Sequence, residues 1–109
     1  MALDVAELAK SMLQAARGRL KKHWPTIKAY VEAVAKKTAE TLAMIEKLRM
    51  AGQISPAEAR LLLEMQRNSA KAVLLTVEGL GLLVAEGAIN AAVNAVRVPV
   101  NKALGFELL

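Results

Sequence analysis

The hydrophobic and polar positions of the chain recur with helical spacing, and the longest such stretch runs from Pro56 to Arg97. Ser55, Pro56 and Glu58 mark its start. Serine caps free backbone N–H groups, proline suits the first helical position, and a glutamate three residues on can return the hydrogen bond. Polar side chains keep to one slowly drifting edge, which indicates a single curved helix. The pattern therefore predicts one helix over 56–97, roughly 60 Å long at ~1.5 Å per residue.

The second half of this predicted helix is apolar nearly all round. Over residues 72–96 the only charged side chains are Glu78 and Glu86. A helix of this kind must be buried in a core, an interface or a bilayer. If the Gly-Leu-Gly segment 79–81 bends, the following residues can fold back and close a four-helix bundle. The near-continuous polar edge favours the other alternative, a projecting helix that needs a partner from another chain.

A shorter helix is predicted at the N-terminal end, over residues 4–23. Asp4 is suited to the N-cap, and Glu7 occupies the capping-box position three residues later. The dipeptide at 24–25 marks the end of this helix, because the residue before Pro25 is pushed out of the α region. Proline then suits the start of the next helix.

The next predicted helix covers residues 25–51 and has the heptad spacing typical of a coiled coil. Gly52 is suited to a left-handed helix end, and the short connection makes 25–51 an antiparallel neighbour of 56–97. The predicted fold class is therefore all-α. It consists of this antiparallel hairpin plus the N-terminal helix 4–23, in one domain over 1–109, and the bundle is completed by oligomerisation.

A third proline, Pro99, is predicted to end the helical run at or shortly before Val98. The tail beyond it is apolar. We expect Phe106, Leu108 and Leu109 to dock on a surface that the sequence does not identify.

Composition strengthens the expectation of an uncovered apolar surface. The chain has 109 residues, of which 55% are hydrophobic and only 3% aromatic, with a mean hydropathy of +0.32. A domain of this size buries only about two thirds of the surface of its unfolded chain. Small aliphatic side chains in such excess suit close helix packing. We therefore predict a self-association interface on the long helix, formed by Leu75, Gly79, Leu82, Leu83, Glu86, Ile89, Asn90, Val93 and Asn94.

Charge is distributed unevenly along the chain. The net charge is +5 and the first fifty residues carry all of the excess. No acidic residue lies between Glu7 and Glu32, and the cluster within that gap forms a candidate patch for an anionic partner: Arg17, Arg19, Lys21, Lys22, Trp24 and Lys28. Phosphates are one such partner. The alternative is a solvated helix end, where cations are favourably placed.

Several kinds of chemistry are excluded by residue type. The absence of cysteine excludes disulfides and thiolate sites, and His23 is the single histidine. Glu78 and Glu86 would lie about 12 Å apart along one helix, too far to share a metal ion. We therefore predict no catalytic, metal or cofactor-binding residues, no small-molecule substrate, and a protein that is not an enzyme.

Three functions follow as hypotheses. The first is a non-enzymatic protein that self-associates, or packs against a protein partner, through 56–97. The first alternative is a membrane-associated helical protein with 72–96 in or on the bilayer, since that length suffices to span it. The second alternative is a nucleic-acid-binding module that uses the basic cluster within 17–28. The start of the chain lacks a basic region before an apolar core, so we expect no secretory signal and a cytoplasmic or membrane-associated location.

Overall fold

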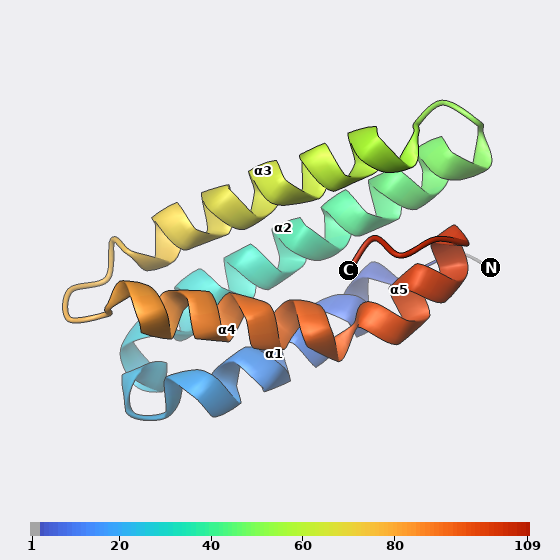
Figure 1. The fold of residues 1–109 in the computed structure, drawn as a ribbon. Coiled ribbons are helices and arrows are strands. Elements are labelled where there is room, and N and C mark those ends of the chain that lie inside the picture. Colours follow the sequence, from blue (N-terminus) through green and yellow to red (C-terminus); the bar gives the residue numbers. More distant parts are fainter. Residues whose placement is uncertain (1–2) are drawn as a thin grey trace.

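Residues 3–109, which the computed structural model describes, form a bundle of four antiparallel helices with a fifth, short helix at one end (Figure 1). The helices are α1 (Val5–Leu20), α2 (Trp24–Met50), α3 (Pro56–Leu74), α4 (Leu82–Ala95) and α5 (Arg97–Leu104), and the 3-10 turn η1 (Lys21–His23) joins α1 to α2. Helix α1 packs closely against both α2 and α4, whereas α3 and α4 approach each other less closely. The predicted all-α class is confirmed.

The helix starts are fixed by the predicted caps. Asp4 Oδ1 accepts a hydrogen bond from the Glu7 backbone N–H at 3.2 Å. Ser55 and Glu58 form a reciprocal capping box, with distances of 3.1 Å from Glu58 N to Ser55 Oγ and 3.0 Å from Ser55 N to Glu58 Oε1. These hydrogen bonds lower the pKa of Glu58, because they favour its charged form.

The hairpin of α2 and α3 is also confirmed. Gly52 has a positive φ of 70° in the connecting turn, as its predicted role requires. Between the two helices, the buried side chain of Gln66 donates from Nε2 to Thr38 Oγ1 at 3.2 Å, and that hydroxyl donates to the Val34 carbonyl. The apolar seam of α2 therefore contains one satisfied polar contact with α3.

The prediction of one continuous helix over 56–97 is wrong. Helix α3 ends at Leu74, residues 75–81 form a turn, and α4 runs back along the bundle (Figure 1). Gly79 has a φ of 84°, which favours glycine over any residue with a Cβ. Thr76 reinforces the break, because its hydroxyl donates to the Val73 carbonyl at 2.6 Å and competes with helical hydrogen bonding.

The polar edge that suggested continuity has a different origin. Lys71 Nζ on α3 lies 3.4 Å from Glu86 Oε1 on α4, and Arg67 donates to Asn90 Oδ1 across the same seam. The polar edges of the two helices therefore face each other in an antiparallel pair. If the segment is drawn as one straight helix, these residues form one continuous polar edge. In the structure, the chain reverses direction between the two halves of that edge.

The core consists of two clusters of buried apolar side chains, one toward each end of the bundle. The cluster near the chain termini includes Leu8, Met12, Leu42, Ile45, Leu63, Val96, Val100, Leu104 and Leu108. The other includes Leu20, Ile27, Val31, Leu74, Val77, Leu80, Ala85, Ile89 and Val93. The second cluster contains Ala85, Ala88, Ile89 and Val93 of α4, so the chain's own helices cover Ile89 and Val93, two residues of the predicted interface.

The region after α4 differs from the prediction as well. Helix α4 ends at Ala95, as a break before Pro99 requires, but α5 begins at once and contains Pro99 in its first turn. Proline is tolerated there, since the first turn needs no backbone donor at that position. The sequence analysis missed this helix.

The C-terminal tail docks on the bundle of its own chain, which supplies the surface that the sequence left unidentified. Asn101 Oδ1 accepts hydrogen bonds from the backbone N–H groups of Leu108 and Leu109, each at 2.9 Å, and Leu108 is buried. The Phe106 ring lies beneath two guanidinium groups, with Arg49 Cζ at 5.1 Å and Arg60 Cζ at 5.7 Å from the ring centroid.

Candidate functional site

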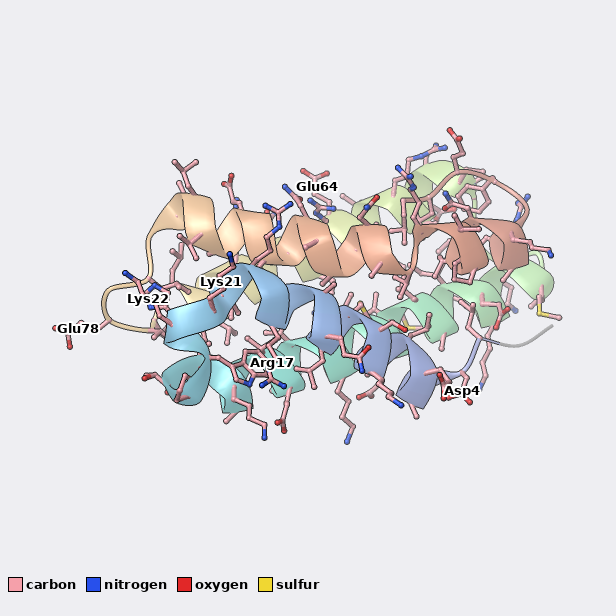
Figure 2. The ribbon with its side chains drawn as sticks, turned by 90° about the horizontal axis from the view of Figure 1, so that it is seen from below. Asp4, Arg17, Lys21, Lys22, Glu64 and Glu78 are labelled. Atoms are coloured by element: carbon pink, nitrogen blue, oxygen red, sulfur yellow. The ribbon has the colours of Figure 1, made fainter. Side chains whose placement is uncertain are left out.

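One end of the bundle brings together two segments that are far apart in the sequence. We call it the bundle tip; it comprises residues 17–28 around η1 and residues 73–83 around the α3–α4 turn. Figure 1 shows η1 and this turn at the same end of the molecule. Figure 2 shows Lys21, Lys22 and Glu78 at that end, with Arg17 farther along α1.

The corner between α1 and α2 directs its basic side chains into solvent. Leu20 and Ile27 are buried on either side of it and hold the corner against the core. Lys21 has a φ of 38°, and its backbone N–H donates to the Arg17 carbonyl, which ends α1. The α-helix therefore ends at Leu20, three residues before the predicted end at His23, and Lys21 and Lys22 are exposed on the 3-10 turn.

The whole predicted basic patch lies at this corner. The five cations Arg17, Arg19, Lys21, Lys22 and Lys28 are all exposed, and Trp24 is half-buried. Arg17 Cζ lies 5.6 Å from the centroid of the Trp24 ring, within range of a cation–π contact. Lys28 Nζ lies 3.8 Å from Glu32 Oε1 in a solvent-exposed pair. Such a pair contributes little stability and leaves Lys28 open to a partner.

The α3–α4 turn presents aliphatic side chains at the same end. Val77 and Leu80 point inward and close the core. Leu75, Leu82 and Leu83 are exposed by 41%, 51% and 83%, together with Val73. Leucines at this level of exposure gain from burial. The turn is therefore an apolar surface at the same end of the molecule as the basic corner (Figure 1).

The predicted self-association interface does not form a single face. Ile89 and Val93 are buried in the core of the same chain, and Glu86 and Asn90 pair with α3 across the seam. The remaining members are exposed: Leu75, Gly79, Leu82, Leu83 and Asn94. The fold thus divides the set into core, seam and surface, and leaves its leucines on the bundle tip.

Electrostatically, the bundle tip is strongly asymmetric. Residues 17–28 contain five cations and no carboxylate, and residues 73–83 contain one carboxylate, Glu78. The tip thus carries four more positive than negative side-chain charges. Such a surface attracts anions, and the attraction weakens as salt rises.

A second exposed apolar feature is a groove between α2 and α3 that the sequence analysis did not single out. Met44, Leu62 and Met65 line it, with Lys37 and Glu40 at its edge, and Leu61 is exposed nearby. The sequence does contain a signal for this groove. Helix α3 has apolar residues on its outer side, in addition to the single apolar stripe that faces the core.

The described residues contain few features of other kinds of site. Over residues 3–109 no three His, Cys, Asp or Glu side chains gather in a way that suits a metal ion. Within the same residues, no helix has the length and apolar character needed to cross a membrane.

Comparison with known proteins gives no match. No family model matches the chain, and neither curated proteins nor solved structures show significant similarity to it. The class that the fold defines is an antiparallel four-helix bundle, and its function must be argued from the surface of this chain.

Proposed function

We propose that this protein is a non-enzymatic helical module that binds peripherally to an anionic lipid surface through the bundle tip. The observation that supports the proposal is that exposed leucines on the α3–α4 turn and five exposed cations around the α1–α2 corner lie at the same end of the bundle (Figure 1). Aliphatic side chains enter the boundary between headgroups and acyl chains, while cations contact the headgroups.

The magnitudes are those of reversible binding. Transfer of an exposed leucine side chain out of water contributes up to about 1.5–3 kcal/mol, and Leu82 and Leu83 are the most exposed leucines of the tip. Each cation near an anionic leaflet contributes about 1 kcal/mol. Association costs several kcal/mol, so both contributions are needed for useful affinity. The module should therefore release when either the leucines or the cations are removed.

Of the two forms of the membrane hypothesis, the proposal takes binding on the bilayer surface. Residues 72–96 are interrupted by the turn at 75–81, and α4 has 14 residues, short of the ~20 that a bilayer requires. The nucleic-acid alternative relies on the same cations. The tip offers aliphatic side chains where base stacking calls for aromatic ones, and its one aromatic residue, Trp24, is engaged by Arg17.

The main physical argument for self-association does not hold in this fold. In the sequence, the apolar segment 72–96 has no evident packing partner within the chain, which favours self-association. In the structure, α1 and α3 pack against α4. Assembly through 56–97 stays a prediction without that support.

Sedimentation with vesicles tests the proposed function. We expect the protein to bind vesicles that contain phosphatidylserine at low salt, to bind neutral phosphatidylcholine vesicles much less, and to dissociate as salt rises. The double change Leu82→Ser and Leu83→Ser should weaken binding at least about tenfold through the loss of apolar burial. Lys21→Gln with Lys22→Gln should weaken it by a similar factor through the loss of charge.

The matched control is Leu61→Ser, because Leu61 is also exposed but lies near the start of α3, whereas the tip lies at the end of α3. It should bind like the unaltered protein. The proposal is contradicted if the unaltered protein does not bind anionic vesicles at low salt, or if Leu61→Ser weakens binding as much as the tip variants. Binding to duplex nucleic acid in place of vesicles would assign the cations to the second alternative.

A further inference from the structure

The seam between α3 and α4 contains an unfilled apolar cavity next to a polar cleft. We propose that this seam binds a small aliphatic carboxylate, with the end of its chain in the cavity and its carboxylate on Arg67. The proposal concerns residues outside the bundle tip, and its outcome is independent of lipid binding.

The cavity arises from small side chains at facing positions. Alanines from all four long helices line it, and together they leave about 30 Å³ unfilled in the middle of the bundle; the principal ones are Ala16, Ala35, Ala70, Ala88 and Ala92. About 10–15 Å³ on this measure holds one water-sized group, so the cavity has room for about two. Its walls are almost entirely apolar. Empty cavities in proteins are apolar, and they can take up apolar groups.

A polar cleft of about 250 Å³ adjoins the cavity on the outer side of the seam. Arg67 and Ile89 line both spaces, so the two share a wall. The cleft also contains Lys71 and Glu86, which form an ion pair at 3.4 Å. Since Glu86 offsets one of the two cations, the cleft retains one excess positive charge, on Arg67.

Arg67 is suited to hold a carboxylate at this position. One of its terminal nitrogens donates to Asn90 Oδ1, and a guanidinium group has five N–H donors in all. The donors that remain match the two oxygens of a carboxylate in a bidentate contact. The residue is half-buried, and its hydrogen bond to Asn90 lies on the exposed side of the seam, where a ligand in the cleft can reach the guanidinium.

The size of the cavity determines the class of ligand. It accommodates a terminal methyl group and about one methylene, and the rest of a short chain lies in the cleft beside Ile89. A long acyl chain would have to displace packed side chains, at a cost typical of overpacking. The geometry therefore favours a short or medium-chain monocarboxylate. Each buried methylene contributes about 0.8 kcal/mol.

The test is a titration of the full chain with octanoate and with octanol, followed by nitrogen-15 NMR. We expect octanoate to shift the Arg67 Nε–H signal and the amide signals around Ala70 and Ala88. Arg67→Gln should weaken octanoate binding at least about tenfold and change octanol binding less than about twofold, since only the carboxylate uses the guanidinium. Arg97→Gln, an exposed arginine on α5, is the matched control and should bind like the unaltered protein.

A second variant separates the contribution of the apolar cavity to binding from that of the Arg67 charge. Ala92→Val adds two carbons to the cavity wall at a half-buried position and should weaken both ligands while the fold is kept. The proposal is overturned if octanoate shifts only the signals of the bundle tip, if Arg67→Gln leaves octanoate binding unchanged, or if Ala92→Val has no effect on either ligand.

Discussion

Leu42→Ala lowers the free energy of unfolding by about 3 kcal/mol, within the 2–5 kcal/mol typical of leucine truncation in a core. Leu42 lies on α2 and is 1% exposed, in the cluster that α1, α2, α3 and α5 enclose. The loss combines transfer of the missing methyl groups with the cavity left behind. Denaturant unfolding followed by circular dichroism measures it. A domain of this size has a total stability of about 5–15 kcal/mol, so the loss is a large fraction of it.

The matched control is Leu83→Ala, which makes the same chemical change at a position exposed by 83%. It should alter the free energy of unfolding by less than about 0.5 kcal/mol. If residues 82–96 packed against another chain, Leu83→Ala would lower the free energy of unfolding, and the size of that loss would depend on protein concentration. Equal losses at the two positions would contradict the division into core and tip described above.

Ala85→Leu is expected to have the second largest effect. Ala85 is 0% exposed on α4, the helix that packs most closely against α1. Three added carbons at this contact force the helices apart or push side chains away from their preferred rotamers, which costs typically 1–3 kcal/mol and occasionally more. Thermal unfolding followed by circular dichroism should show a clearly lowered midpoint.

Ala95→Leu tests whether this effect arises from packing. Ala95 is at the exposed end of the same helix, so the substitution should be nearly neutral. If Ala85→Leu were also neutral, α1 and α4 would not be in the close contact that completes the bundle.

Local signals in the sequence predicted a large part of the fold. The caps at Asp4 and Ser55 and the turn at Gly52 depend on neighbouring residues only, and the structure has all three. The sequence also allows a bend at 79–81, but the near-continuous polar edge favours a straight helix, and the observed turn over 75–81 begins earlier than that bend. That edge is continuous only along the chain. Its two halves meet through Arg67–Asn90 and Lys71–Glu86, pairs that become visible once the direction of α4 is known.

The two segments of the candidate site were each predictable from the sequence, but their arrangement in space was not. The cations of 17–28 form a cluster in the sequence itself, and the structure keeps them together on one exposed corner. The sequence also predicts that the leucines at 75 and 82–83 belong to an interface. Their location at the same end of the bundle as those cations depends on the turn. A linear pattern gives the chemistry of each segment, whereas their proximity is a property of the folded chain.

The proposed surface depends on the chain folding back between α3 and α4, and a distance across that seam tests it most directly. Glu64 and Asn94 are exposed and flank Arg67 and Asn90, and the chain has no cysteine of its own. Spin labels on Glu64→Cys and Asn94→Cys, measured by pulsed electron paramagnetic resonance in protein diluted with unlabelled chain, should give a distance below about 30 Å, as neighbouring helices require. A continuous helix would place them about 45 Å apart, beyond the 43 Å length of the whole molecule. That longer distance would contradict the fold and, with it, the bundle tip.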